Sequence, residues 1–462
     1  MTRIQIAGNV PLNGEISVQG SKNAVLPILA ASVLHRGKTI LHHCPRIRDV
    51  EYMTEIMREL GCQVYWQEHT LQIDASQLVS SSIREELASK LRASVILMGS
   101  LLGRCGCARI PYPGGCSIGQ RPIDLHLYAM RCLGYKIFEM DHMVQICKDA
   151  GSRCGEADIA FSFPSVGATE NAILAAVLED GVTRIGGCAQ EPEIAELCSF
   201  LNQKGACICG VGTKQLIIHG VSALKDSEYC LMSDRIVAGS YLCAAAGTGG
   251  TIRLRGIIPG QLLALTDVLQ QMGAQVEWGR HWIALDASRK KLQATTAATA
   301  PYPGFPTDLQ SQIMAVMTKA AGVSLVQENL FESRFQTAAE LQKMGAKIKI
   351  QDRMAYITGV PLLMGTEVTA HDLRGGAALV IAGLMAEGNT VVKESQYIDR
   401  GYEDICGDLQ QLGALISREP EEGVDYATAK EKKEESAEDI STCICGSAGI
   451  RSGHSVRTVS CS

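Results

Sequence analysis

Leu60-Gly61-Cys62-Gln63-Val64 is the first of six copies of a short pattern that runs through most of the 462-residue chain. In each copy a helix-like stretch ends at a glycine, and residues of alternating polarity follow. The glycine suits the left-handed residue that terminates many helices, and the alternation predicts a strand. Successive glycines are 73, 71, 68, 72 and 68 residues apart, and they are Gly61, Gly134, Gly205, Gly273, Gly345 and Gly413.

A second pattern recurs between these copies: a nearly all-apolar stretch that ends in glycine. A helix that is apolar on every side is buried on every side. Six buried and six amphipathic helices, separated by strands, predict six α/β units, and three units make a domain of roughly 210 residues, within the usual range. The expected buried helices are 24–37, 93–103, 168–181, 236–247, 309–322 and 376–388.

The repeats therefore predict two similar α/β domains, each with its buried helices packed inside its sheets. The boundary is expected between the third and fourth units, near Cys230-Leu231-Met232. We expect residues 22–232 to form one domain and residues 1–21 plus 233–419 to form the other. The mixed-charge and aperiodic residues 420–462 predict a disordered tail.

Charge and composition exclude several classes of function. The chain has 43 Lys and Arg against 49 Asp and Glu, a formal charge of −6, whereas a nucleic-acid-binding protein normally carries a basic stripe and a high pI. The conspicuous apolar run 24–34 is too short to span a bilayer. The N-terminus lacks a long apolar leader with a cleavage site. We expect a cytoplasmic protein that binds neither nucleic acid nor membrane.

The 18 cysteines fit a reducing compartment, because disulfide frameworks are typical of short secreted chains. Most lie in apolar contexts, as small buried hydrophobic residues do. Pairs such as Cys105/Cys107 are separated by one residue, not by the two to four usual at zinc sites. We expect no metal and no cofactor.

Charged and polar groups collect at the starts of the expected buried helices. Ser21, Ser233 and Thr307 are expected to be N-caps. Capping does not explain the cations, because Lys or Arg at a helix N-terminus opposes the macrodipole. Cations at several equivalent helix starts indicate an anion-binding cleft, since helix N-termini themselves attract phosphate and carboxylate. The starts are 21–23, 90–92, 169–171, 233–235, 307–308 and 372–374.

Two further residues have both a plain and a chemical interpretation. Cys116 lies in the Gly- and Pro-rich loop 111–126, where a thiol is accessible and Arg121 could lower its pKa. Such a cysteine is either inert or reactive. Asp308 follows Pro306-Thr307 at a helix start, and it is either a capping residue or a general base.

Taken together, these motifs resemble the UDP-N-acetylglucosamine enolpyruvyl transferases, over about residues 1–418. The resemblance implies a fold of two inside-out α/β domains of three repeats each. The motifs include 20–24, 91–94, the loop 113–122, 165–171, 191–194, 233–235, 305–308, 331–335, 372–374 and 399–403. At 43–45 the chain has His-Cys-Pro where the family usually has Asn-Val-Pro.

The resemblance implies transfer of the enolpyruvyl group of phosphoenolpyruvate to the 3′-hydroxyl of UDP-N-acetylglucosamine, with release of phosphate, as the first committed step of peptidoglycan synthesis. Cys116 would protonate C3 of phosphoenolpyruvate and Asp308 would take the hydroxyl proton. Lys22, Arg121 and Arg400 would hold phosphoenolpyruvate. The residues implied to line the cleft or contact the nucleotide sugar are Asn23, Arg92, Arg121, Pro122, Ile123, Asp124, Leu125, Val166, Gly167, Asp308, Leu330, Arg334 and Arg374.

Two alternatives stay open. One is the sister transferase that acts on shikimate 3-phosphate, although the Gly-Gly-Cys loop speaks against it. The other is an idle paralogue that binds a nucleotide sugar without turnover. Against it stands the presence of Lys22, Cys116, Asp308 and Arg400 together, because a binder needs neither a thiol nor a base.

Overall fold

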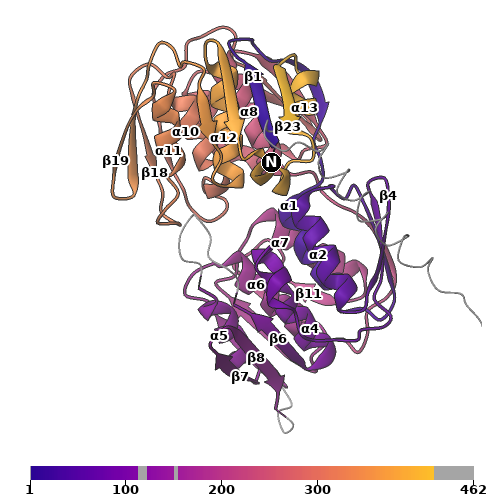
Figure 1. The fold of residues 1–462 in the computed structure, drawn as a ribbon. Coiled ribbons are helices and arrows are strands. Elements are labelled where there is room, and N and C mark those ends of the chain that lie inside the picture. The colour runs from indigo at the N-terminus through magenta and orange to yellow at the C-terminus, as the bar shows by residue number, and fades with distance from the viewer. Residues whose placement is uncertain (1, 113–121, 150–154, 421–462) are drawn as a thin grey trace, which may run out of the picture. The chain divides into compact units, whose positions relative to one another are not determined.

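A computed structural model describes residues 2–112, 122–149 and 155–420 (Figure 1). Its hydrophobic side chains form two separate clusters. The first core contains residues between Val25 and Leu231. The second core contains residues between Ile4 and Val18 together with residues between Ile236 and Ile416.

The first core has three helices at its centre, α1, α4 and α6, which contact one another. Their bounds and those of the surrounding helices are α1 Lys22–Ser32, α2 Arg48–Glu59, α3 Glu85–Ala88, η1 Arg92–Ile96, α4 Leu97–Cys105, α5 Asp124–Cys132, α6 Val166–Ala176 and α7 Pro192–Gln203. Three sheets enclose them, in the strand orders β13-β3-β5-β4, β6-β8-β7 and β11-β12-β10-β9. The strands are β3 Lys38–His42, β4 Gln63–Gln67, β5 Thr70–Asp74, β6 Cys107–Pro111, β7 Tyr135–Met140, β8 Met143–Lys148, β9 Glu156–Ala160, β10 Val182–Gly186, β11 Cys207–Cys209, β12 Gln215–His219 and β13 Ser227–Cys230.

The second core repeats this plan around α8, α10 and α12, and every residue of α12 is buried. The helices are α8 Arg235–Thr248, η2 Pro259–Leu262, α9 Leu263–Gln271, η3 Thr307–Leu309, α10 Gln310–Met317, α11 Thr337–Lys343, α12 Leu373–Met385, η4 Ser395–Arg400 and α13 Ile405–Gln411. The sheets run β15-β16-β14-β2, β17-β18-β20-β19 and β21-β22-β1-β23. The strands are β1 Thr2–Ala7, β2 Asn13–Ser17, β14 Thr251–Arg255, β15 Gln275–Trp278, β16 Trp282–Asp286, β17 Thr296–Ala298, β18 Val323–Gln327, β19 Lys347–Gln351, β20 Met354–Thr358, β21 Glu367–Thr369, β22 Asn389–Lys393 and β23 Leu415–Pro420.

The predicted fold class is confirmed: the described residues form six α/β units with apolar helices inside their sheets (Figure 1). The six repeat glycines all have positive φ, between 81° and 108°, as the helix-ending role requires. Strand β1 pairs with β22, and β2 pairs with β14, so the first strands of the chain complete sheets of the second core.

The helix ends differ from the prediction in detail. Four of the buried helices, α1, α6, α10 and α12, stop before their expected glycines; α1, for example, ends at Ser32. Helices α4 and α8 instead continue past Gly103 and Gly247, to Cys105 and Thr248. Ser21 is an N-cap as predicted, and it accepts from Ala24 N at 3.3 Å. Ser233 is not a cap, because Asp234 caps α8 instead. Thr307 is not a cap either; it begins η3, and its hydroxyl donates to Glu328 Oε2.

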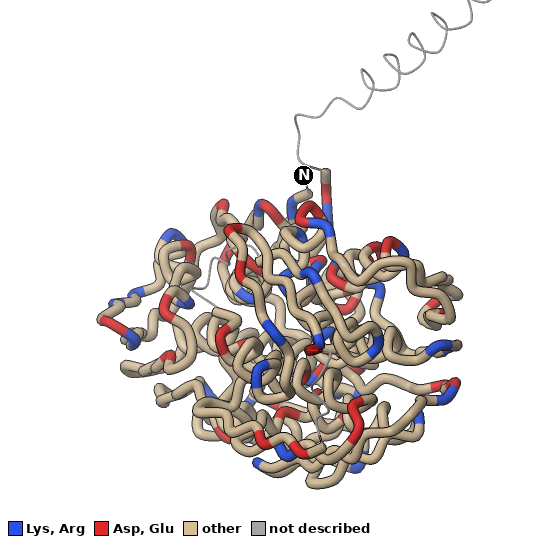
Figure 2. Tube along the Cα trace, turned by 90° about the horizontal axis from the view of Figure 1, so that it is seen from below, with Lys and Arg blue, Asp and Glu red and all other residues tan. Residues whose placement is uncertain are grey.

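Charged residues of both signs are spread over the described residues (Figure 2), consistent with the small net charge. Across the described ranges, the helices are all too short or too polar to qualify as membrane-crossing segments. Strand β23 extends through Pro420, the first residue of the predicted tail, and residues 421–462 lie outside the described residues.

Candidate active site

Asp308 lies between two arginine side chains. Its Oδ1 accepts from Arg334 Nη2 at 3.0 Å, and its Oδ2 accepts from Arg374 Nη2 at 2.9 Å. Asn23 Nδ2 reaches Oδ2 from the first core at 3.5 Å. Both arginine side chains are about 5% exposed or less, whereas that of Asp308 is 29% exposed. The carboxylate is therefore partly exposed and lies between two buried guanidinium groups.

A second carboxylate, Asp49 on α2, joins two more of the predicted cations. Lys22 Nζ lies 2.9 Å from Asp49 Oδ2. Arg400 donates to the same group through Nε at 2.8 Å and through Nη2 at 3.3 Å. Asp49 is 2% exposed. This paired geometry suits arginine, whose planar fork matches a carboxylate bidentately.

Helix starts bring these groups together. Asp234 caps α8 by accepting from Ile236 N and Val237 N through Oδ1, and its Oδ2 accepts from Lys22 N at 2.9 Å. One carboxylate therefore links the first turns of α1 and α8. Asp372 caps α12 in the same way and thereby holds the backbone of Arg374.

The electrostatics reflect the crowding of cations. Burial alone would raise the pKa of Asp308, but the charges of Arg374, Arg334 and Lys22 outweigh it and hold this pKa far below its usual value. Burial is also the largest influence on Lys22, and it lowers the pKa of its amine despite the opposing effect of Asp49. The four cations outnumber the two carboxylates that pair with them, so the surroundings of an anion placed here would be net positive.

Two buried arginine nitrogens beside Asp308 have no hydrogen-bond partner in the described part of the chain. They are Nε of Arg334 and Nη1 of Arg374. Leaving a buried donor of a charged group unpaired costs about 1–3 kcal/mol or more. Phosphate and carboxylate oxygens are the acceptors that guanidinium donors pair with best.

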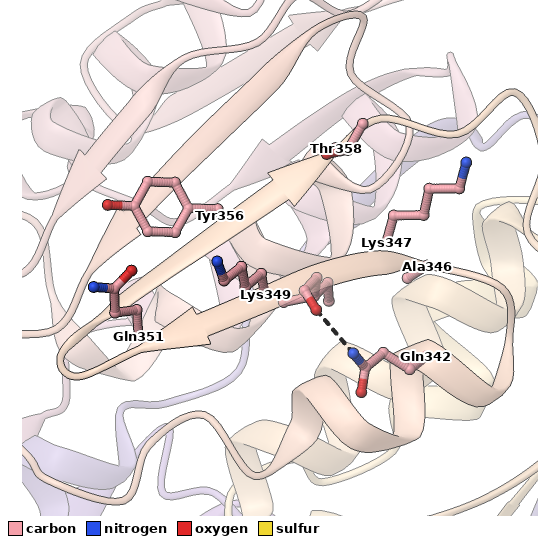
Figure 3. Close-up of a pocket in the computed structure, with 8 residues that line it drawn as sticks. Gln342, Ala346, Lys347, Lys349, Gln351, Tyr356 and Thr358 are labelled. Carbon is pink, nitrogen blue, oxygen red and sulfur yellow. Dashed lines mark hydrogen bonds between the residues drawn. The ribbon is translucent and has the colours of Figure 1, made fainter.

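A hollow of about 330 Å³ adjoins the start of α5. Its lining includes Pro122, Ile123 and Asp124 from the predicted set, together with Tyr112, Leu127, Arg131 and Glu139. Tyr112 donates from Oη to Glu139 Oε2 at 2.9 Å. A larger hollow of about 500 Å³ lies on β19, β20 and α11, where Gln342, Lys349 and Tyr356 line it, and it contains none of the predicted site residues (Figure 3).

The predicted pair Val166-Gly167 forms the first turn of α6. A Cβ at Gly167 would lie 2.9 Å from Cε1 of His126 on α5, so a larger residue here would require the His126 ring to shift. His126 Nδ1 is 2.8 Å from Asn171 Nδ2, and Asn171 Oδ1 accepts from Gly99 N at 2.6 Å. This buried chain of contacts ties α5, α6 and α4 together.

The remaining predicted residues are more scattered. Arg92 begins η1, Leu125 lies on α5, and the backbone N of Leu330 donates to Glu328 Oε1 at 2.8 Å. Cys116 and Arg121 lie outside the described residues.

Sequence reasoning assigned no role to three acids that hold the site. Asp49 was not singled out, and Asp234 and Glu193 were noted only as parts of the stretches 233–235 and 191–194. Glu193 is 2% exposed and accepts from Arg235 Nε at 2.9 Å and from Nη2 at 3.2 Å. The only available signal was Arg235 itself, because a cation at the start of a buried helix needs a counter-ion.

Comparisons with known proteins identify the family of the chain. Residues 6–409 match the protein family described as EPSP synthase (3-phosphoshikimate 1-carboxyvinyltransferase). The chain is 46% identical over 418 residues to UDP-N-acetylglucosamine 1-carboxyvinyltransferase 2 of Caldanaerobacter subterraneus subsp. tengcongensis, covering 90% of this chain and 100% of that one. It is 44% identical to UDP-N-acetylglucosamine 1-carboxyvinyltransferase of Coxiella burnetii, covering 90% and 96%.

Among solved structures, the fold is similar to the enolpyruvyl transferase NikO from Streptomyces tendae, with a TM-score of 0.80 at 24% identity, covering 90% of this chain and 98% of that one. It is also similar to EPSP synthase from Acinetobacter baumannii, with a TM-score of 0.70 at 18% identity, covering 91% and 100%. At these identities the structures bear on the fold alone.

Proposed function

Because the chain belongs to the UDP-N-acetylglucosamine 1-carboxyvinyltransferase family of enolpyruvyl transferases, we propose that it transfers the enolpyruvyl group of phosphoenolpyruvate to the 3′-hydroxyl of UDP-N-acetylglucosamine and releases phosphate. This reaction supplies peptidoglycan synthesis. The two substrates are small and carry several negative charges, and the charged cluster around Asp308 suits them.

The observation that carries the proposal is the set of unpartnered nitrogens on Arg334 and Arg374 beside Asp308. These buried donors have no partner among the described residues, and an anion that reached them would satisfy them beside a carboxylate that can act as a base. Lys22 and Arg400, held by Asp49, add two more cations. We propose that these four cations bind the phosphate and carboxylate of phosphoenolpyruvate, as planar guanidinium groups do well.

The reaction is an addition followed by an elimination. The sugar oxygen bonds to C2 of phosphoenolpyruvate while C3 gains a proton, and the hydroxyl proton passes to Asp308. The C2–O bond to phosphate then breaks as C3 loses a proton, which restores the double bond. In this proposal Cys116, outside the described residues, supplies the proton to C3. The acid acts on phosphoenolpyruvate and the base acts on the sugar hydroxyl, the two molecules that the new bond joins.

The lowered pKa of Asp308 bears directly on this step. Burial would raise it, but Arg374 and Arg334 lower it, so that the carboxylate is a weak base while both guanidinium groups hold it. We propose that phosphoenolpyruvate draws these cations toward its own charges. The pKa of Asp308 then rises toward the range in which it accepts a proton. Binding of one substrate thereby prepares the base for the other.

The hollow at the start of α5 and the first turn of α6 are the proposed nucleotide-sugar contacts. The proposed nucleotide-sugar contacts also include Asn23, Arg92, Arg121, Leu125, Val166, Gly167 and Leu330.

We further propose that residues 22–232 and residues 1–21 plus 233–419 are the two domains, which the two separate hydrophobic cores support. A cytoplasmic location is proposed as well, since all the described cysteines are free thiols, as in reducing compartments.

The experiment that tests the proposal is identification of the product. The chain is incubated with phosphoenolpyruvate and UDP-N-acetylglucosamine, and the nucleotide sugar is examined by mass spectrometry and NMR. We expect an enolpyruvyl ether at the 3′ oxygen. Recovery of unaltered nucleotide sugar from a folded protein that binds it would instead identify a non-catalytic paralogue.

A further inference from the structure

Two cysteines face each other across neighbouring strands, away from the charged cluster. Strands β6 and β8 are antiparallel, and their register places Cys107 opposite Cys147. Both are free thiols and partly exposed. Other described strand cysteines face different residues: Cys207 is opposite His219, and Cys230 is opposite His42.

The backbone hydrogen bonds identify the kind of pair. One residue outward on each strand, Lys148 N donates to Gly106 O at 2.7 Å. Arg109, two residues after Cys107 on β6, hydrogen-bonds through its backbone to residues outside β8. Its N donates to Ser81 O at 2.9 Å, and its O accepts from Ile83 N at 3.0 Å. Hydrogen-bonded and non-hydrogen-bonded pairs alternate along an antiparallel ladder, so Cys107 and Cys147 form a non-hydrogen-bonded pair.

This is the pair type in which opposite side chains come closest. Its Cα atoms are typically about 4.5 Å apart, within the range of about 4.4–6.8 Å that a disulfide spans. The two side chains also share one face of the sheet, because Ala108 and Ile146 are buried on the other face. Each sulfur has an uncharged polar neighbour: Ser81 Oγ lies 3.3 Å from Cys107 Sγ, and Gln145 Nε2 lies 3.6 Å from Cys147 Sγ.

We propose that Cys107 and Cys147 are a reversible redox modification site, at which a small-molecule disulfide of the oxidised-glutathione class introduces a cross-strand disulfide. One cysteine thiolate attacks the small disulfide, forms a mixed disulfide and expels one small thiolate. The other cysteine thiolate attacks the protein sulfur of this mixed disulfide and expels the second small thiolate. The protein pair gives up two electrons and two protons, and the small disulfide takes them up to become two thiols.

The new bond would tether strands that are already paired in the folded chain. It constrains the unfolded chain and is therefore expected to raise the midpoint of thermal unfolding. Cys107 begins β6, whereas Tyr112, beyond the other end of β6, lines the hollow at α5. Turnover is therefore expected to stay unchanged by this bond. The inference does not depend on the proposed enzymatic activity.

The test is disulfide mapping of the folded full-length chain. After incubation with oxidised glutathione, free thiols are alkylated and the protein is digested with trypsin. Cleavage after Arg104, Arg109, Lys136 and Lys148 gives peptide 105–109, with Cys105 and Cys107, and peptide 137–148, with Cys147. We expect these two peptides to be linked and to separate on reduction. Cys107→Ser and Cys147→Ser should abolish the link, whereas Cys105→Ser should keep it.

Three outcomes would overturn the proposal. The link could depend on Cys105 rather than Cys107, the thiols could carry only glutathione adducts, or protein unfolded in guanidinium could give the same link in the same yield. Turnover is compared between wild type and Cys147→Ser under the same oxidation. If wild type and Cys147→Ser lose turnover equally, the loss arises from oxidation of other thiols. If only wild type loses turnover, the expectation that the Cys107–Cys147 bond leaves turnover unchanged is contradicted.

Discussion

Arg374 donates through Nη2 to Oδ2 of Asp308 at 2.9 Å, although Asp308 is the group that must accept a proton in the proposed reaction. Asp308 can play both roles only if one follows the other in time. We propose that Asp308 neutralises a buried cation before substrate binds, and that Arg374 turns to the anionic substrate once it arrives. The ion pair is then a resting state of the site.

Replacement of Asp308, the proposed base, tests this order of events. Asp308→Asn keeps the size of the side chain but cannot accept the proton, so kcat should fall about 100- to 10,000-fold, the usual contribution of general base catalysis. Binding of UDP-N-acetylglucosamine, measured by calorimetry, should change little. Glu277→Gln, which alters an exposed carboxylate on β15, is the matched control. Near-normal turnover by Asp308→Asn would remove this residue from the mechanism.

Asp49 should matter for both stability and turnover. Asp49→Asn removes the charge that holds Lys22 and Arg400, and we expect a loss of about 1.5–3 kcal/mol in the free energy of unfolding at pH 7. We also expect kcat/KM for phosphoenolpyruvate to fall about tenfold or more, because about 1.4 kcal/mol of lost positioning corresponds to tenfold. Chemical denaturation and initial-rate kinetics measure the two effects.

The pH dependence of the Asp49 contribution has a definite sign. Burial opposes ionisation, but Lys22 and Arg400 more than offset it and lower the pKa of Asp49 below its unfolded value. The stabilisation is therefore present above the unfolded pKa, about 3.9, and is lost as the pH falls through the folded pKa. Wild type should lose stability more steeply than Asp49→Asn below about pH 4. Parallel curves would contradict this assignment.

Cys116 has a different expected signature. Cys116→Ser retains a small polar side chain but offers a much weaker acid, so turnover should fall by at least about 100-fold. Calorimetric binding of UDP-N-acetylglucosamine should survive. Loss of binding together with activity would show that the loop serves recognition rather than proton transfer.

The buried pair of Glu193 and Arg235 should be costly to break on one side only. Glu193→Gln leaves the guanidinium of Arg235 without its counter-ion, and the side chain of Arg235 is 7% exposed. We expect a loss of about 3–5 kcal/mol in the free energy of unfolding. The double variant Glu193→Gln/Arg235→Met should recover part of that loss, because no lone cation remains. A double variant less stable than Glu193→Gln would argue against this reason.

Lys204 offers a stabilising substitution. It precedes the third repeat glycine, where the other five copies have Leu or Met, and it is fully buried with Nζ donating to Thr39 and Ser227 hydroxyls. Burial lowers its pKa from 10.5 to about 8. The cost of the buried charge, about 3–3.5 kcal/mol for such a shift, is present below pH 8 and is relieved as the pH rises toward 10.5.

Lys204→Met should therefore raise the free energy of unfolding at pH 7 by about 1–2 kcal/mol, since the two hydroxyls left behind offset part of the gain. The rise in wild-type stability between about pH 8 and pH 10.5 should disappear in the variant. Denaturation curves across that range provide the measurement. A variant less stable than wild type at pH 7 would mean that the hydrogen bonds of Lys204 outweigh its charge burial.

Local patterns were enough to predict the repeating architecture. The conformation of each repeat glycine and the burial of each central helix depend on nearby residues and on apolar content, both visible in the sequence. The partners of the cations were not visible, because Arg400 meets Asp49 across 351 residues and Arg374 meets Asp308 across 66. The cap of α8 was misplaced by one residue, since Ser233 and Asp234 are both good caps and only the fold selects between them.

Phosphate release from phosphoenolpyruvate, followed with either UDP-N-acetylglucosamine or shikimate 3-phosphate as acceptor, tests the central claim most directly. We predict release with the nucleotide sugar and not with shikimate 3-phosphate. The rate should fall about 100- to 10,000-fold in Asp308→Asn and stay unchanged in Glu277→Gln. Release with shikimate 3-phosphate alone, or with neither acceptor by a folded protein, would contradict the account.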